Sequence, residues 1–491
     1  MFLETILSMI QRSSVLFSII SERLSDYVFY TVQLGDTPFP LIVLFFMATG
    51  IYFSLYFRLI NVFGLPHAFR LLVQKSLAKS DTKGDMSHFQ ALTTALSGTV
   101  GLGSIGGVAV AIAVGGPGTL VWIILAGFLA MPIKMTECAL GVMHRQTLAN
   151  GTVAGGPMYF LEKGLKAYHW PKLGRFLGRF YAMGILICAF GIGATFQSNQ
   201  ISHQLAFVMH WDLESGGVLF GIGCSIAFVV ALVILGGIKN IGRVAEKLVP
   251  FMIIFYLLTA FIIIFWKIRL LPQALALIWQ DAWSVKSASG GALGAVVIGF
   301  QRAIFTNEAG VGSAAIAHSA AKTADPIDQG IISLMEPFLA TMIVCSTTAL
   351  LLTVTLILPG HALPTEAGVR LTSQAFANYY PWLLYPLSIV IFLFGFTTIL
   401  AWSYYGQIGW QYLFGFGAYH TKLYQLFFCC MVAIGGILSL QAVLQFSDAL
   451  LFLISVPNLF GCLLFAHQLK PSLVQKISPK IKVADVQTLD L

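Results

Sequence analysis

The tetrapeptide GLGS at residues 101–104 recurs as GVGS at residues 310–313, and both copies lie inside long apolar stretches. Closely spaced glycines weaken a helix, and the bilayer core offers no water to the backbone groups that a broken helix frees. Those groups then need partners within the protein or on a bound ligand. Two interrupted helices at corresponding places in two halves of a chain are typical of the substrate site of a secondary transporter. The two tetrapeptides therefore predict an all-α polytopic membrane protein with two discontinuous helices around such a site.

The composition of the whole chain supports this class. Of its 491 residues 57% are hydrophobic and 10% are charged, and its mean hydropathy is +0.84. About a quarter of the residues of a soluble domain are charged. The net charge of +8 is spread over loops, so it does not predict nucleic-acid binding. The seven cysteines lie in apolar segments, which favours packed thiols over disulfides or metal ligands.

Hydrophobic segments of about 20 residues, the length that spans a bilayer, can be counted along the chain. The second to sixth segments and the seventh to eleventh form two runs of five with opposite orientations, so they predict an inverted five-plus-five repeat. The first segment is then an extra N-terminal helix. The eleven spans are expected near residues 38–57, 89–113, 117–143, 179–208, 216–235, 248–266, 292–317, 329–358, 382–412, 424–443 and 446–467.

The same segmentation divides the chain into six parts. The start of the chain, to about Ile20, is apolar but interrupted by charges, which indicates an interfacial amphipathic helix. The parts are an N-terminal interfacial segment (1–37), the extra helix with a cytoplasmic loop (38–88), the first repeat (89–266), an extracellular loop (267–291), the second repeat (292–467) and a cytoplasmic tail (468–491).

The distribution of Lys and Arg predicts the orientation in the membrane. With the N-terminus outside, 20 of the 28 basic residues fall in segments on the cytoplasmic side. Cytoplasmic loops carry such an excess of positive charge. We therefore expect the N-terminus outside and the C-terminus in the cytoplasm.

The first glycine cluster has two other interpretations. Gly101, Gly103 and Gly106 match the dinucleotide-binding string G-x-G-x-x-G, but no strand-like segment precedes them and no acidic residue follows before Glu137. Close packing of helices through small residues explains some of the glycines. It does not explain why polar side chains gather at both breaks, namely Thr99, Ser104, Thr306, Asn307 and Glu308.

Charges inside the predicted spans are functional candidates because they are costly there. Lys134 and Glu137 are three residues apart on one helix face, which favours a local ion pair. Glu308 lies at the second break and is expected to support the unwound backbone, rather than to balance a cation or bind a proton. Arg302 is expected to attract a carboxylate or to pair with an acid. His318 is expected to cap a helix or face water rather than to bind a metal ion.

Three runs of sequence carry a resemblance to a known family. The runs FTNEAGVGSAAIAH (305–318), GGPMY (155–159) and TTILAWSYYG (397–406) resemble the alanine/glycine:cation symporter family, and the likeness extends from about residue 38 to about residue 470. This resemblance implies uptake of small neutral amino acids across the bacterial plasma (inner) membrane with Na⁺, or in some members H⁺, as the coupling ion. It also implies the inverted-repeat fold shared with the neurotransmitter:sodium symporters, no enzymatic activity and no cofactor.

The resemblance also implies a substrate pocket. Backbone N–H groups at the first break would bind the carboxylate, two aromatic side chains would restrict the pocket to small substrates, and Gln197 would donate or accept a hydrogen bond. For Gln197 and its neighbour Asn199, a polar clamp between helices is the alternative. The substrate residues carried over from the family are Leu102, Gly103, Gln197, Phe305, Thr398 and Trp402.

A cation site is implied in the same way. The ligands carried over are the carbonyl groups of Ser97, Val100 and Phe394 and the hydroxyl groups of Thr397 and Thr398. Uncharged oxygen ligands suit a monovalent ion better than a divalent one. The alternative for each threonine is a hydrogen bond to its own helix.

These observations together predict a symporter that works by alternating access, with the membrane, a small neutral amino acid and Na⁺ as its partners. The sequence leaves open whether the substrate is alanine, glycine, serine, glutamine or D-alanine, and whether H⁺ replaces Na⁺. A channel or a non-transporting sensor of the same fold is the remaining alternative. The oligomeric state is left open as well.

Overall fold

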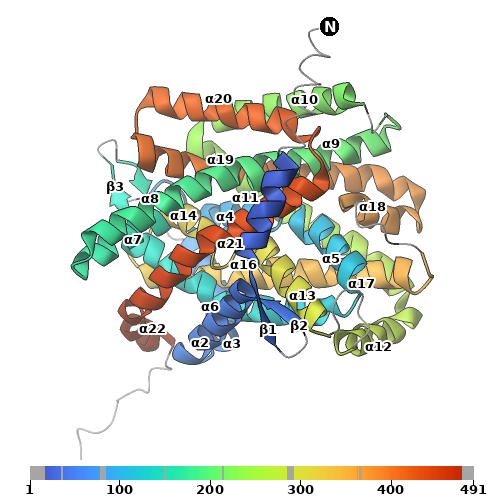
Figure 1. Cartoon of the computed structure of the whole chain (residues 1–491), viewed down its shortest axis with the longest axis horizontal. Helices are drawn as coiled ribbons and strands as arrows, with labels where there is room; N and C mark the ends of the chain where they lie inside the picture. The colour runs from blue at the N-terminus through green and yellow to red at the C-terminus, as the bar shows by residue number, and fades with distance from the viewer. Residues whose placement is uncertain are drawn as a thin grey trace, which may run out of the picture.

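The computed structural model describes residues 17–34, 37–77, 84–148, 151–212, 215–284, 292–361, 363 and 368–477. Helices dominate this part of the chain, and they pack into one body (Figure 1). Most of the predicted interfacial helix at the start of the chain lies outside the described residues, although residues 17–28 are helical. Two short antiparallel hairpins are present, β1 (Thr31–Leu34) with β2 (Thr37–Pro40) and β3 (Gln146–Thr147) with β4 (Val153–Ala154).

The first half of the chain contains both α-helices and π-helices. Its helices are α2 (Leu41–Tyr56), α3 (Ile60–Leu77), α4 (His88–Thr99), the π-helix η1 (Gly103–Gly107), α5 (Val108–Gly115), α6 (Thr119–Met143), α7 (Pro157–Ala167), α8 (Pro171–Cys188), the π-helix η2 (Ala189–Phe196), α9 (Gln197–Val208), α10 (Gly216–Ile234) and α11 (Gly237–Trp266).

The second half follows the short helices η3 (Ile268–Leu270) and α12 (Leu271–Ala282). Its helices are α13 (Ala292–Asn307), α14 (Ser313–Ser319), α15 (Pro326–Ser333), α16 (Met335–Pro337), η4 (Phe338–Cys345), α17 (Ser346–Leu352), η5 (Thr353–Ile357), α18 (Val369–Ala377), η7 (Pro381–Leu383), α19 (Leu384–Phe414), α20 (Ala418–Gly435), α21 (Leu440–Phe465), η8 (Ala466–Gln468) and α22 (Lys470–Ile477).

Seven helices among the described residues are long and apolar enough to cross a membrane, and two bent helix pairs raise the number to nine. These nine coincide with nine of the eleven expected spans. The other two expected spans, near 292–317 and 424–443, correspond to the interrupted pair α13 and α14 and to α20. The boundary expected at residue 443 is wrong, because α20 ends at Gly435 and α21 already begins at Leu440.

Both predicted interruptions are present. The axis bends by 43° between α4 and the segment that begins at Gly103. In the second half, α13 ends at Asn307 and α14 begins at Ser313. The backbone between them passes through positive φ angles at Glu308 (51°), Gly310 (79°) and Gly312 (87°). Glycine adopts such angles at little cost, which explains why the glycines of the second tetrapeptide can lie in the non-helical segment between α13 and α14.

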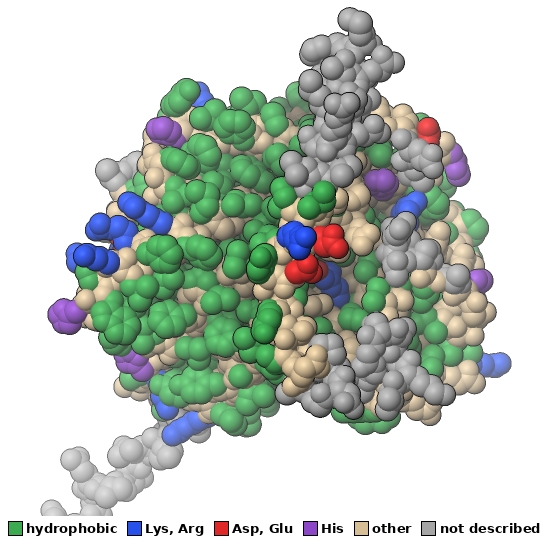
Figure 2. Space-filling model, in the orientation of Figure 1, with side chains coloured by type: hydrophobic (Ala, Val, Ile, Leu, Met, Phe, Trp, Pro, Cys, Tyr) green, Lys and Arg blue, Asp and Glu red, His purple; other side chains and the backbone are tan. Residues whose placement is uncertain are grey.

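The packing brings the two breaks together at the centre of the molecule. Helix α6 contacts α13, α14 and α15, while α19 contacts α4, α8 and α9. The helices α10 and α20 lie side by side along the upper edge in Figure 1. Hydrophobic side chains cover much of the face drawn in Figure 2. Large apolar side chains remain exposed on α10 and α11, including Phe228, Leu232, Ile254 and Leu258, as expected for helices that face lipid.

Candidate functional site

The first break leaves backbone donors available. A capping box between Ser87 and Gln90 starts α4, which then runs to Thr99. Beyond it, the Gly107 N–H donates to the Leu102 carbonyl over 3.4 Å, a hydrogen bond across five residues, so the chain resumes as a π-helix. Within the described residues, the backbone N–H groups of Gly101 and Leu102 donate no hydrogen bond. Such groups at a helix interruption suit an anionic ligand.

The second break is supported by side chains from distant helices. The Gly310 N–H donates to Glu137 Oε2 over 2.9 Å, and the Gly310 carbonyl accepts from Asn458 Nδ2 over 2.7 Å. The Tyr181 hydroxyl donates to the Val311 carbonyl over 2.9 Å. Side chains of distant helices therefore satisfy the backbone groups of Gly310 and the carbonyl of Val311, and a non-helical segment at this depth needs such partners.

Glu308 supports the same segment and connects it to α19. Its Oε2 accepts from the Ser313 hydroxyl over 2.5 Å, and its Oε1 accepts from Trp402 Nε1 over 3.0 Å. This arrangement agrees with the expected supporting role. It also ties a residue of the second break to one of the predicted substrate residues.

The predicted substrate residues come together between the breaks. A Cβ added to Gly103 would meet Phe305 Cε1 at 2.9 Å, so the first break touches the last turn of α13. Phe305 packs edge-to-face against Phe196 at the end of η2, with 5.3 Å between ring centroids. Trp402 Cβ would lie 2.3 Å from a Cβ on Gly193 in the same π-helix. Phe305 and Trp402 therefore both contact the π-helix η2.

Gln197 follows η2 directly. Its Nε2 donates to the Ile192 carbonyl over 3.3 Å, while its buried Oε1 has no hydrogen-bond partner among the residues that the structure describes. Asn199 instead donates to the carbonyls of Gly435 and Leu438, which is the polar clamp between helices expected as the alternative for these residues. The two amides differ because residues two positions apart on a helix point about 200° apart.

The predicted cation ligands divide into two groups. Thr398 Oγ1 lies 2.8 Å from the carbonyl oxygens of both Ser97 and Phe394, so three of the predicted oxygens meet where α4 ends against α19. Thr397 bonds within its own helix, to the carbonyls of Leu393 and Phe394, and its hydroxyl contacts Met252 Sδ. Val100 is the buried residue that follows α4 directly.

Access to this region is closed by protein. Leu102, Gln197, Phe305, Thr398 and Trp402 are each at most 3% exposed. On one side of Phe305, the Arg302 guanidinium carbon lies 5.1 Å from the ring centroid and the guanidinium pairs with Asp448 of α21. Arg302 therefore pairs with an acid, one of the two roles expected for it.

A buried ion network was missed in the sequence. Lys134 and Glu137 do form the expected pair, with 3.4 Å between Nζ and Oε1, but Nζ also lies 3.7 Å from Glu336 Oε2. Glu137 further accepts from Asn458 and from Gly310 at the second break. The charged residues inside the predicted spans were the sequence signal that could have indicated this network. Their connection to the break depends on contacts between residues far apart in the sequence.

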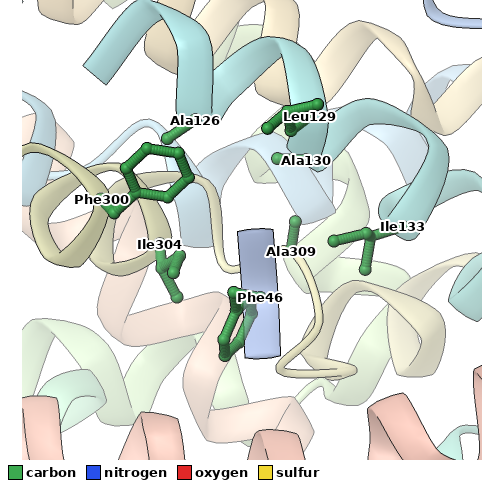
Figure 3. A pocket seen from close by; sticks show the side chains of 8 residues that line it. All are labelled: Phe46, Ala126, Leu129, Ala130, Ile133, Phe300, Ile304 and Ala309. Carbon is green, nitrogen blue, oxygen red and sulfur yellow. The ribbon is translucent and has the colours of Figure 1, made fainter. Parts of the chain in front are cut away.

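A small cavity near the second break is a poor candidate for an amino-acid site. It has a volume of about 10 Å³ and lies between α2, α6 and α13, beside Ala309. Figure 3 shows that the labelled side chains around it contain carbon atoms alone. They are Phe46, Ala126, Leu129, Ala130, Ile133, Phe300, Ile304 and Ala309. A zwitterion there would lose its hydration without gaining hydrogen bonds.

Comparison with known proteins gives four findings. Residues 27–478 match the model of the sodium:alanine symporter family. The sodium/alanine symporter AgcS of Methanococcus maripaludis is 37% identical over 87% of this chain and 92% of its own length. YrbD of Bacillus subtilis, named for sodium/proton-dependent alanine carriage, is 34% identical over 77% of each chain. The crystal structure of MhsT in complex with L-phenylalanine matches with a TM-score of 0.58 at 12% identity, over 77% of this chain and 89% of MhsT, and therefore shows the fold.

Proposed function

We propose that this chain takes up alanine or glycine together with Na⁺. It belongs to the sodium:alanine symporter family and is a transporter rather than an enzyme. The two five-helix repeats, 89–266 and 292–467, would provide alternating access to one site between the breaks. We place the chain in the bacterial inner membrane, with the N-terminus outside and the C-terminus in the cytoplasm. The orientation rests on the distribution of basic residues.

The single observation that carries the substrate class is the pair of free donors at the first break. The N–H groups of Gly101 and Leu102 are buried without a hydrogen bond inside the described part of the chain, and an α-carboxylate satisfies such donors. Phe305 packs against Gly103, directly beside these groups. The anionic end of an amino acid is therefore proposed to lie at Gly101, Leu102 and Gly103.

Two further features favour a small neutral amino acid. Gln197 Oε1 is a buried acceptor without a partner in the described part of the chain, and an α-ammonium group is a donor that fits it. Phe305 and Trp402 both contact η2, and we expect their rings to leave little room for a long substrate side chain. A hydrophobic wall discriminates against added methylene groups by about 1–3 kcal/mol each.

The proposed Na⁺ site lies at the contact of α4 with α19. The oxygens of Ser97, Phe394 and Thr398 meet there, and Val100 and Thr397 complete the set implied by the family resemblance. Both hydroxyl groups bond to carbonyls of α19, but Thr398 also reaches the Ser97 carbonyl of α4, so we expect Thr398 to contribute more to cation binding than Thr397 does.

Uptake of labelled alanine and glycine into proteoliposomes tests the proposal, with gradients of Na⁺, K⁺ and H⁺ imposed one at a time. We expect accumulation that follows the Na⁺ gradient. Accumulation driven by H⁺ alone would favour the proton-coupled alternative, which the name of YrbD suggests. Accumulation that ignores all three gradients would contradict symport, and binding without accumulation would indicate a sensor.

A variant at the first break gives a matched control. A Cβ on Gly101 would lie 2.4 Å from Thr398 Oγ1, so Gly101→Ala pushes the two parts of the proposed cation site apart. We expect this variant to lose at least about tenfold in Na⁺-dependent uptake, roughly 1.4 kcal/mol. Gly221→Ala adds a methyl group that meets nothing within 4 Å, and its uptake should equal that of the unmodified protein.

A further inference from the structure

A buried chain of hydrogen bonds connects α4 to α16. His88 Nδ1 lies 2.5 Å from Gln329 Oε1, and Gln329 Nε2 lies 2.5 Å from His318 Nδ1. His318 Nε2 then lies 2.5 Å from Glu336 Oε1. None of these four side chains is more than 4% exposed. His318 is thus fully enclosed, and the expectation that it caps a helix or faces water is wrong.

The chain continues to the second break. Glu336 Oε2 lies 3.7 Å from Lys134 Nζ, and Lys134 is paired with Glu137. Glu137 accepts the Gly310 N–H. Through these contacts the beginning of the first broken helix, at His88, is connected to the unwound backbone of the second.

An amide accepts at its oxygen and donates at its nitrogen, so the assigned orientation of Gln329 implies one protonation state for His318. In that orientation Oε1 accepts from His88 Nδ1–H, and Nε2 donates to His318 Nδ1. His318 Nδ1 is then an acceptor, so the ring is neutral and carries its proton on Nε2, which donates to Glu336. The amide in the middle of the chain permits one direction at a time.

The charges in this cluster do not balance. One ammonium, Lys134, faces two carboxylates, Glu137 and Glu336, and all three side chains are 0% exposed. With a neutral His318 the group has a net charge of −1, which is costly away from water. One added proton makes it neutral.

We propose that His318 and Glu336 form a proton-binding site, and that its occupancy is linked to the arrangement of the second break. This inference rests on the proposed function. The added proton binds to His318 Nδ1 and gives an imidazolium that remains paired with Glu336. Gln329 rotates its amide to accept from Nδ1, and its NH₂ group then faces His88, whose proton moves from Nδ1 to Nε2.

Other charged or titratable groups surround the pair. Cys138 Sγ lies within 4.8 Å of the ligand atoms of His318 and Glu336. Arg145 holds the end of α14 through the carbonyls of Ser319 and Ala321. The remaining groups are Lys134 and Glu137 on α6, Glu308 at the second break, His88 on α4 and Tyr405 on α19. A divalent metal ion is a poorer occupant than a proton, because the Lys134 ammonium already lies 3.7 Å from Glu336.

The pH dependence of thermal unfolding in detergent tests the site without any substrate. A proton bound in the folded state stabilises it at low pH, and this stabilisation is lost as the pH rises. Histidine titrates between about pH 8 and about pH 5. As the pH is lowered through this range, the melting temperature of the unmodified protein should therefore rise relative to that of His318→Gln. The exposed His420 is the control, and His420→Gln should follow the unmodified protein.

Transport provides the second readout. At saturating Na⁺, alanine uptake by the unmodified protein should change severalfold over the same pH range, whereas His318→Gln and Glu336→Gln should both give flat profiles. Glu336→Gln keeps the test open if His318→Gln does not fold. Parallel pH dependences of unfolding and uptake in the unmodified protein and in both variants would overturn the inference. Absence of alanine and glycine uptake at every pH, with the unfolding difference present, would instead contradict the proposed function.

Discussion

Thr397 and Thr398 are neighbours in α19, and both hydroxyl groups bond to the Phe394 carbonyl of their own helix. Thr398 also reaches the Ser97 carbonyl on α4, whereas the other backbone partner of Thr397 is the Leu393 carbonyl of α19. Successive residues point about 100° apart around a helix, so the rotation of α19 about its axis decides which hydroxyl faces α4. The sequence identified both threonines but contained no information on that rotation.

Thr398→Val removes the hydroxyl and keeps the shape of the side chain. We expect the Na⁺ concentration for half-maximal alanine uptake to rise at least about tenfold, or roughly 1.4 kcal/mol of lost binding. Thr353→Val is the control, because the buried Thr353 hydroxyl bonds to Ala349 within its own helix segment. A Na⁺ titration of uptake that gave the same half-maximal concentration for both variants would remove Thr398 from the site.

Glu137 illustrates a residue whose type is evident but whose role is not. A carboxylate within a span was noticeable in the sequence, and its ion pair with Lys134 was predicted correctly. Its hydrogen bond to Asn458 joins residues 321 positions apart. Such contacts follow from how helices pack, which no local pattern encodes.

At the level of elements, the two breaks share a sequence pattern but are stabilised differently. The first continues into a π-helix and keeps donors at Gly101 and Leu102 free within the described residues. The second is enclosed by Glu137, Asn458 and Tyr181. Because Gly310 and the Val311 carbonyl already have side-chain partners in the second break, we propose the first break for the substrate carboxylate.

Gly312 tests the second break. Its φ is +87°, and an added Cβ would lie 2.3 Å from Pro157 Cγ and 2.8 Å from the Tyr181 hydroxyl. Gly312→Ala should therefore abolish uptake and lower the melting temperature in detergent. Gly360 has a similar φ of +82° with nothing within 4 Å of the added Cβ, so Gly360→Ala should cost only about 1 kcal/mol of backbone strain. Equal effects of the two substitutions would show that backbone strain, not packing at the break, matters.

At the level of the whole molecule, a few polar contacts tie the broken helices to their surroundings. Thr398 joins α19 to α4, Trp402 joins α19 to Glu308, and Arg302 joins α13 to α21 through Asp448. Alternating access requires helices to move relative to one another around the site. In the proposed transport cycle, those contacts that join moving parts would form and break.

The Arg302–Asp448 pair allows a charge-swap test. Both side chains are largely buried, and removing one partner of such a pair leaves an uncompensated charge at a cost of about 3–5 kcal/mol. Arg302→Ala and Asp448→Ala should each strongly reduce alanine uptake. The double variant Arg302→Asp with Asp448→Arg should recover a substantial part of it, as measured in proteoliposomes. No recovery, at normal expression, would mean that the positions of the charges matter beyond their attraction.

The sequence by itself determined the membrane class, most of the spans, both helix interruptions and the family. Each of these depends on local properties, since the length of an apolar segment and the φ angles open to glycine are set within a few residues. Only the tertiary structure decided which side chains support the second break, which threonine faces α4 and that His318 is enclosed. Those outcomes depend on the rotation and packing of helices that are distant in the chain, so they are fixed when the helices pack together.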